Sequence, residues 1–99
     1  MPEFKFTKKA VKDLSNIWNY TLETWSEKQA DKYYNQIIKK CTFLSKKPES
    51  GTIYFAVIEN LRSTKINKHL IFYRIIDVDT IEIERILHER MDIVKRLKE

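Results

Sequence analysis

The side chains that would do chemistry in this chain are cations and two histidines, gathered in its C-terminal part. Attack of a ribose 2′-hydroxyl on phosphate needs a base, an acid and positive charge around the phosphorane. His88 with Arg85 and Arg90 would fill these roles in an RNA-cutting site. No second residue is spaced to activate the first, so we expect no catalytic residue and interpret the set as a solvated basic face. The set comprises Arg62, Lys65, Lys68, His69, Arg74, Arg85, His88 and Arg90.

Metal and cofactor chemistry is not expected. The segment His88-Glu89-Arg90-Met91-Asp92 starts like the zinc-protease pattern of two histidines four residues apart on a helix. The position of the second histidine holds Asp92, however, and the segment follows a strand instead of lying on a helix. Cys41 falls on the apolar face of a helix, and as the single cysteine it is expected to be a small core residue.

Composition predicts one small globular domain that spans residues 1–99. Hydrophobic residues make up 42% and charged residues 33% of the chain, which excludes a disordered protein. No apolar run approaches the roughly 20 residues of a membrane span, and the lone cysteine fits a reducing cytoplasm. Nineteen Lys and Arg against fourteen Asp and Glu give a net charge of +5, which favours an acidic partner without naming it.

Apolar spacing divides the first half of the chain into a strand and two helices. Residues 3–7 alternate like a short half-buried strand, and Thr7 is the expected N-cap of the helix that follows. The segment Ser26-Glu27-Lys28-Gln29 is typical of a capping box, so a second helix starts there and ends before Pro48. Because almost no loop separates the two helices, they are predicted to form an antiparallel hairpin.

The second half is predicted to be a mainly antiparallel sheet, which makes the fold class α+β. After a Pro48–Gly51 turn, residues 52–58 are β-branched and aromatic, and strands are expected at 62–66, 70–76 and 80–88, followed by a short helix at 91–97. Simple alternation along the last strand places Ile81, Ile83, Arg85 and Leu87 on one face and Glu82, Glu84, Ile86 and His88 on the other.

The first helix carries more aromatic residues than a small core needs. Trp18 and Trp25 are seven residues apart, on the same face as Leu14 and Leu22, so the first interpretation is that they pack on the second helix and the sheet. The alternative is that Trp18, Trp25 and Tyr20 form an exposed groove for a partner helix.

The order of these elements, together with three motifs, resembles the ParE toxins of bacterial type II toxin–antitoxin systems, within the RelE/ParE superfamily. The motifs are Ile17-Trp18-Asn19-Tyr20, His69-Leu70-Ile71-Phe72-Tyr73-Arg74 and Ile86-Leu87-His88-Glu89-Arg90-Met91-Asp92, and matching residues extend over nearly the whole chain. The fold that this resemblance implies is an N-terminal strand, a two-helix hairpin packed on a small sheet, and a short C-terminal helix.

The resemblance also implies a function, partners and sites. It implies a cytoplasmic toxin that inhibits DNA gyrase and so blocks replication and growth, without a cofactor, a membrane or sequence-specific DNA binding of its own. A ParD-like antitoxin would neutralise it in a hetero-oligomer, wrapping the helical hairpin and the sheet edge. The toxic surface is expected at Arg85, His88, Arg90 and Met91, supported by Arg62 and Arg74, and the antitoxin-binding residues are expected to be Trp18, Tyr20, Trp25, Tyr54 and Phe55.

Two alternatives stay open. The related RelE branch cleaves messenger RNA on the ribosome with basic residues and a tyrosine or histidine near the C-terminus, and His88, Arg85 and Arg90 stand near such a place. A third possibility is a non-toxic remnant that only binds antitoxin. The chain departs from the expected pattern after Gly51, where residues 52–60 are apolar and lack the arginine expected of many ParE-like chains. If this segment forms an edge strand of the sheet, it would pair with a strand of the antitoxin.

Overall fold

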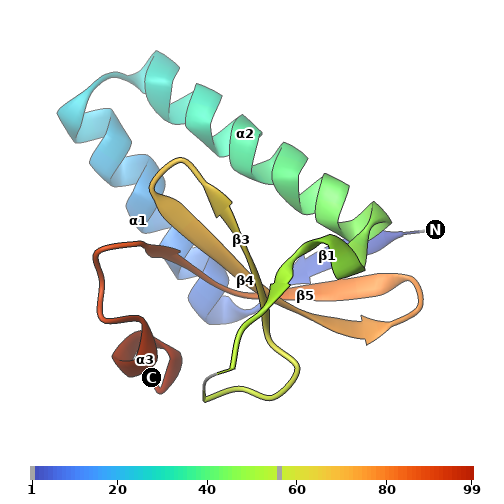
Figure 1. Cartoon of the computed structure of the whole chain (residues 1–99). Helices are drawn as coiled ribbons and strands as arrows, with labels where there is room; N and C mark the ends of the chain where they lie inside the picture. The colour runs from blue at the N-terminus through green and yellow to red at the C-terminus, as the bar shows by residue number, and fades with distance from the viewer. Residues whose placement is uncertain (1, 56) are drawn as a thin grey trace.

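The computed structural model describes residues 2–55 and 57–99, and it places a helical hairpin on one face of a five-stranded sheet (Figure 1). The spatial strand order is β1-β5-β4-β3-β2, in which β1 runs parallel to β5 and the other pairs are antiparallel. This arrangement confirms the predicted α+β class. The elements are β1 (Glu3–Phe6), α1 (Lys8–Thr24), α2 (Glu27–Lys46), the 3-10 turn η1 (Pro48–Ser50), β2 (Thr52–Ile53), β3 (Arg62–Ile66), β4 (His69–Asp77), β5 (Thr80–His88) and α3 (Ile93–Leu97).

The helices α1 and α2 begin where the sequence predicts, and α3 begins two residues later than predicted, because capping side chains satisfy backbone amides that have no partner inside the helix. The Thr7 hydroxyl accepts a hydrogen bond from the Ala10 amide at 3.0 Å, and the Ser26 hydroxyl accepts one from the Gln29 amide at 3.1 Å. Asp92 caps α3 in the same way, at 3.1 Å from the Lys95 amide. No helix in the described parts of the chain is long and apolar enough to cross a membrane.

β5 changes its inward face halfway along its length. Two consecutive residues of β4 lie opposite Arg85 and Ile83, so Glu84 is an extra residue that forms a β-bulge. Beyond the bulge, Ile86 packs in the cluster beneath the helices and Leu87 packs on the opposite face. The single alternation predicted for this strand is therefore wrong after Glu84, because a bulge shifts the side-chain phase by one residue.

Both faces of the sheet are covered. The larger cluster lies between the sheet and the hairpin, where Ile37, Cys41 and Leu44 of α2 are fully buried, and Cys41 is thus a core residue as expected. The smaller cluster lies on the other face beneath α3 and the segment that joins β2 to β3. Its buried members are Leu61, Phe72, Leu87 and Leu97.

The apolar segment 52–58 forms far less strand than its composition suggests. Only Thr52–Ile53 pairs with β3, and the chain then leaves the sheet, with Ala56 outside the described residues. Tyr54 turns back onto the smaller cluster, where its ring meets Phe72 edge-on at 5.2 Å between centroids. Composition misleads here because β-branched residues favour a strand only where a neighbouring strand is available to pair.

A buried ion pair joins α1 to the end of β5. The Asp13 carboxylate accepts from Arg85 Nε at 2.8 Å, from Arg85 Nη2 at 3.0 Å and from the Ile86 amide at 3.0 Å. The two side chains are only 11% and 10% exposed. Because β1 ends at Phe6, this carboxylate takes over the edge of β5 that β1 no longer covers. The remaining Arg85 donor Nη1 bonds to the Arg96 carbonyl at 2.7 Å and so holds α3 as well.

Replacing Asp13 by asparagine should therefore destabilise the fold strongly. The amide would leave the buried Arg85 charge without a compensating anion, which costs about 3 kcal/mol or more when one partner of a buried pair is lost. Urea unfolding would measure the change. Asp31→Asn is the matched control, because Asp31 is exposed and only accepts from Trp18 Nε1 at 3.2 Å. Equal unfolding midpoints for the two variants would contradict the assigned role of Asp13.

Gly51 is required because the Tyr73 ring occupies the space of a side chain. The Tyr73 hydroxyl accepts from the Gly51 amide at 2.9 Å and donates to the Pro48 carbonyl at 2.7 Å, and a Cβ on Gly51 would lie 2.8 Å from Tyr73 Cε1. We expect Gly51→Ala to lower the free energy of unfolding by about 1–3 kcal/mol, as overpacking does. The loss should shrink in a Tyr73→Phe background, since the oxygen nearest the new methyl group is then gone. A full loss in both backgrounds would argue against this contact.

Candidate functional site

A groove of about 650 Å³ opens where the end of α1 and the start of α2 meet the β3–β4 turn and the end of β5. Its size is that of a small-ligand site or of a slot for a partner's side chains. None of its lining residues is acidic, although the chain contains fourteen Asp and Glu. The lining residues are Tyr20, Thr21, Trp25, Gln29, Lys32, Tyr33, Gln36, Asn67, Lys68, His69, His88 and Arg90.

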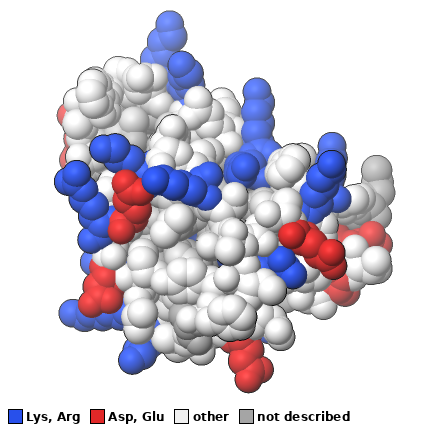
Figure 2. Space-filling model, viewed as in Figure 1, with Lys and Arg blue, Asp and Glu red and all other residues white. Residues whose placement is uncertain are grey.

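A second hollow of about 470 Å³ continues the groove along α1 toward the residues that follow β5. It shares Tyr20, His69, His88 and Arg90 with the first hollow, so the two form one trough. Its own lining comprises Asp13, Asn16, Ile17, Ile86 and Met91. Figure 2 shows how Lys and Arg are distributed around an uncharged centre on one face of the molecule, with acidic side chains interspersed.

Two histidines face each other at the floor of the trough. His69 and His88 are directly paired between β4 and β5, and their rings meet edge-on at 5.2 Å between centroids. The Tyr33 hydroxyl of α2 lies 2.7 Å from His69 Nδ1 and donates to the Ile66 carbonyl at 3.1 Å. Since that hydroxyl has a single proton, both contacts are satisfied when His69 Nδ1 carries a hydrogen, which leaves Nε2 as an acceptor.

The protonation of His69 follows from its surroundings. Burial, and in second place the charge on His88, lower the pKa of His69 from 6.5 to about 4. His69 is therefore neutral at physiological pH. His88 differs, because its Nδ1 accepts a hydrogen bond from the Arg90 amide at 3.1 Å, so its Nε2 carries a proton. The floor of the trough thus offers one acceptor nitrogen beside one donor nitrogen.

The structure brings together five of the predicted site residues and separates the others from them. Tyr20 and Trp25, expected to bind antitoxin, line the same trough as His88, Arg90 and Met91, expected on the toxic surface. Trp25 is 73% and Tyr20 67% exposed. The interpretation of Trp25 as a core residue is therefore wrong, because α1 turns Ala10 and Leu14, and not Trp25, toward the sheet.

Arg85 lies apart from this trough. It is 8% exposed and its donors are engaged by Asp13, the Arg96 carbonyl and Glu99. Hydrogen bonding to Asp13 is the main cause that raises the pKa of the Arg85 guanidinium further above its usual value. Arg85 thus positions the strand that carries His88. Two charged residues at otherwise apolar positions of the sequence indicate this role. Asp13 is an acid within the apolar stripe of α1, and Arg85 is a cation among isoleucines.

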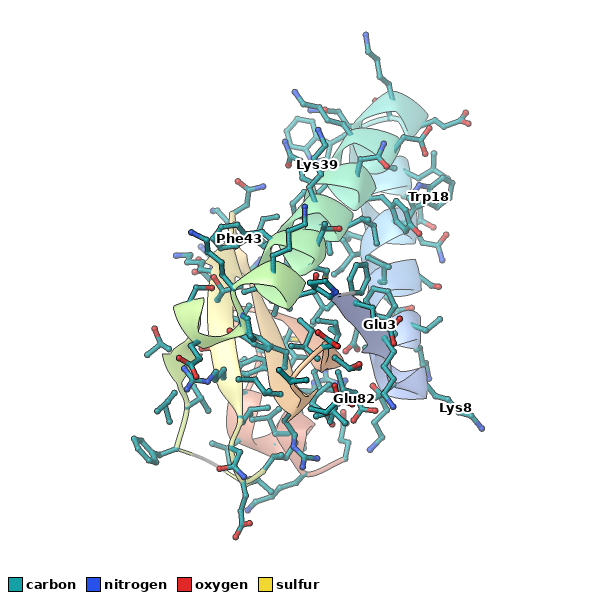
Figure 3. All side chains as sticks on the ribbon, turned by 90° about the vertical axis from the view of Figure 1, so that its right-hand side faces the viewer. Glu3, Lys8, Trp18, Lys39, Phe43 and Glu82 are labelled. Atoms are coloured by element: carbon teal, nitrogen blue, oxygen red, sulfur yellow. The ribbon has the colours of Figure 1, made fainter. Side chains whose placement is uncertain are left out.

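The remaining predicted residues occupy other surfaces. Trp18 points away from the sheet, on the outer side of the hairpin (Figure 3), in a hollow that it shares with Val11 and Tyr34. Phe55 is 94% exposed beyond the sheet edge. Arg62 donates from Nη1 to the Gly51 carbonyl at 2.9 Å and so fixes the turn before β2.

Arg74 and Glu84 form a second polar site, on the sheet face away from the hairpin. Arg74 Nε and Glu84 Oε2 are buried without a hydrogen-bond partner in the described residues. Burial, and in second place the hydrogen bond to and the charge of Glu82, raise the pKa of Glu84 to about 7. Across residues 2–55 and 57–99, no group of three or more His, Cys, Asp or Glu is arranged to hold a metal ion.

Solved structures with this arrangement define the fold. The chromosomal ParDE toxin–antitoxin system of P. aeruginosa superimposes with a TM-score of 0.75 at 21% identity, covering 89% of this chain and 96% of that one. The RelBE2 toxin–antitoxin complex of Mycobacterium tuberculosis superimposes with a TM-score of 0.65 at 21% identity, covering 89% and 99%. The helical hairpin on a mixed sheet is thus a RelE/ParE-like fold.

Sequence comparison assigns the family. Residues 4–93 match the family described as the ParE toxin of the type II toxin–antitoxin system parDE. Toxin ParE1 of Mycobacterium tuberculosis is 29% identical over 84 residues, or 85% of this chain and 86% of its own. Toxin ParE1 of Caulobacter vibrioides is 26% identical over 92 residues, or 93% and 94%. The chain belongs to the ParE toxin family, as its motifs indicated.

The low pKa of His69 makes the stability of the protein depend on pH. An unfolded histidine binds a proton below about pH 6.5, but His69 in the folded chain binds one only below about pH 4. The unfolded state therefore binds this proton first, and the contribution of His69 to stability should fall as the pH drops from 6.5 toward 4, while the raised pKa of Glu84 contributes in the opposite direction. The two histidine resonances would report both pKa values in an NMR titration, and His88→Gln should raise the pKa of His69. A pKa near 6.5 for His69 would refute this assignment.

Proposed function

We propose that this chain is a growth-inhibiting toxin that binds DNA gyrase, blocks replication and is neutralised by a ParD-like antitoxin in a hetero-oligomer. The proposal is supported by the ParE family match over residues 4–93, combined with a trough that presents His88, Arg90 and Met91 to a partner. Met91 is 41% exposed, and a flexible thioether beside a cation suits a protein interface. Inhibition then follows from binding, without turnover of a substrate.

The antitoxin is proposed to cover the toxic surface directly. Tyr20 and Trp25 line the same trough as His88 and Arg90, so a helix seated on the two aromatic rings would also occlude the two basic residues. Large exposed aromatic side chains are typical centres of binding energy. Trp18 with Tyr34 on the outer side of the hairpin, and Phe55 beyond β2, would receive other parts of a wrapping chain.

Cleavage of messenger RNA is the second candidate, and the paired histidines favour it. Neutral His69 has an acceptor nitrogen for the role of base, and His88 beside it would act as the acid in its protonated form, a pair that the sequence alone did not place together. Arg90 and Lys68 line the same groove and would stabilise negative charge on phosphorus.

A gyrase supercoiling assay run beside a ribosome-dependent messenger RNA cleavage assay separates these functions. We expect free toxin to inhibit supercoiling and leave RNA intact. His88→Ala and Arg90→Ala should each raise the toxin concentration needed by about tenfold or more, the effect of losing an interface hot spot. Lys39→Ala, which removes a cation on the outside of α2, should have no effect (Figure 3).

Other results of these assays would change the assignment. Cut RNA with unaffected gyrase would move the chain to the ribonuclease candidate, and loss of cutting in His69→Ala would then identify the base. If the chain binds its antitoxin but inhibits neither gyrase nor translation and does not stop cell growth, it is the non-toxic remnant.

A further inference from the structure

The trough carries a charge and aromatic pattern that protein binding alone does not require. Its larger hollow contains Lys32, Lys68 and Arg90 but no acidic residue. Glu89, the residue between His88 and Arg90 in the sequence, does not line this hollow and is ion-paired with Lys65, with 2.8 Å between Oε2 and Nζ. An anionic ligand in the larger hollow would therefore meet three cations and no carboxylate in its lining, and the Asp13 carboxylate of the smaller hollow is neutralised by Arg85.

The cations of the larger hollow are available to such a ligand. In the part of the chain that the structure describes, neither Lys68 nor Arg90 forms a side-chain ion pair. His88 adds an Nε2 proton, because its Nδ1 already accepts from the Arg90 amide. A guanidinium, an ammonium and an imidazole donor converging on one hollow are the groups that bind phosphate oxygens.

Aromatic rings stand next to these donors. Tyr20 is 67% and Trp25 73% exposed, and both line the hollow that contains Arg90 and Lys68. Bases stack on such rings, and stacking tolerates any base because each has a π face. The hollow of about 650 Å³ also has the volume of a site for a ligand of nucleotide size.

We propose that this trough binds a nucleotide, with its phosphate held by Arg90, Lys68 and His88 and its base stacked on Tyr20 or Trp25. The shared chemistry of a phosphate next to an aromatic base is offered by a free nucleoside triphosphate and by single-stranded nucleic acid. The two sources differ in length, because only a strand would extend from the larger hollow past Tyr20 into the hollow lined by Met91.

Fluorescence of the free toxin would test this directly. The chain has two tryptophans, so a Trp18→Phe variant leaves Trp25 as the single reporter. We expect saturable quenching by adenosine triphosphate or by a DNA oligonucleotide of about ten residues, and weaker binding of inorganic phosphate. DNA lacks the 2′-hydroxyl, so its binding is independent of RNA cleavage.

Substitutions identify the residues that bind the nucleotide. Arg90→Gln and Lys68→Gln should each weaken binding about tenfold and reduce the salt dependence of oligonucleotide binding by about one ion. Tyr20→Ala should weaken it about tenfold through lost stacking, measured by the anisotropy of a labelled oligonucleotide. Lys39→Gln, on the outer side of the hairpin, is the matched charge control and should bind like the parent. Circular dichroism melting would verify that each variant is folded.

The possible outcomes distinguish a free nucleotide from a nucleic-acid strand and also test the proposal itself. Binding of the oligonucleotide alone assigns the trough to a strand, and binding of the triphosphate with no gain from length assigns it to a free nucleotide. Binding of neither at millimolar concentration, or binding that Arg90→Gln and Lys39→Gln weaken equally, would overturn the proposal. Gyrase takes no part in this assay, so such a failure would leave the proposed gyrase inhibition standing.

Discussion

The carboxylate of Asp13 is the contact on which the arrangement of this protein depends. β1 covers only the first half of β5, and beyond Phe6 the open edge would expose unpaired backbone groups. Asp13 accepts from the Ile86 amide there, and the Thr7 hydroxyl donates to the Glu84 carbonyl at 2.8 Å. The same carboxylate neutralises Arg85, whose other donors hold α3. One side chain thus fixes α1, β5 and the C-terminal helix relative to one another.

The relative placement of α1 and β5 by Asp13 determines how the trough is built. Tyr20 and Trp25 of the trough come from the end of α1, and His88 and Arg90 come from the end of β5 and the turn that follows it. Asp13 joins the two elements just beneath the site. The spacing of aromatic and basic side chains is therefore set by a buried ion pair and not by flexible loops. The proposed contacts of antitoxin, gyrase and a nucleotide all fall on this one surface, so neutralisation by direct competition would need no conformational change in the toxin.

The sequence predicts most of the fold because each helix start and turn has its own local chemistry. Thr7 and Ser26 cap the helices, and Asn67 adopts the positive φ of 52° that its turn requires. The β-bulge at Glu84 was missed because it depends on how β4 pairs with β5, and no residue type announces it. The same bulge explains why Arg85 was placed on the wrong side of the strand.

The sequence indicates which candidate residues lie together when they are close in the chain, but it did not indicate where distant elements meet. His88, Arg90 and Met91 follow one another, but the approach of Tyr33 and His69 joins positions 36 residues apart. The exposure of Trp25 depends on where α1 crosses the sheet, which helical periodicity does not fix. Apolar periodicity identifies a stripe, and packing decides how much of that stripe the core uses.

The pairing of the first strand with the last has a consequence for how this toxin is made. Thr7 and Glu84, which are joined by a hydrogen bond, lie 77 positions apart in the chain. At about 5–20 residues per second, roughly 4–15 s of translation separate their synthesis. During that interval β1 has no partner and Asp13 has no guanidinium to bind. The two walls of the trough are therefore held together only after β5 has been made, so the surface proposed to bind partners is completed late in synthesis.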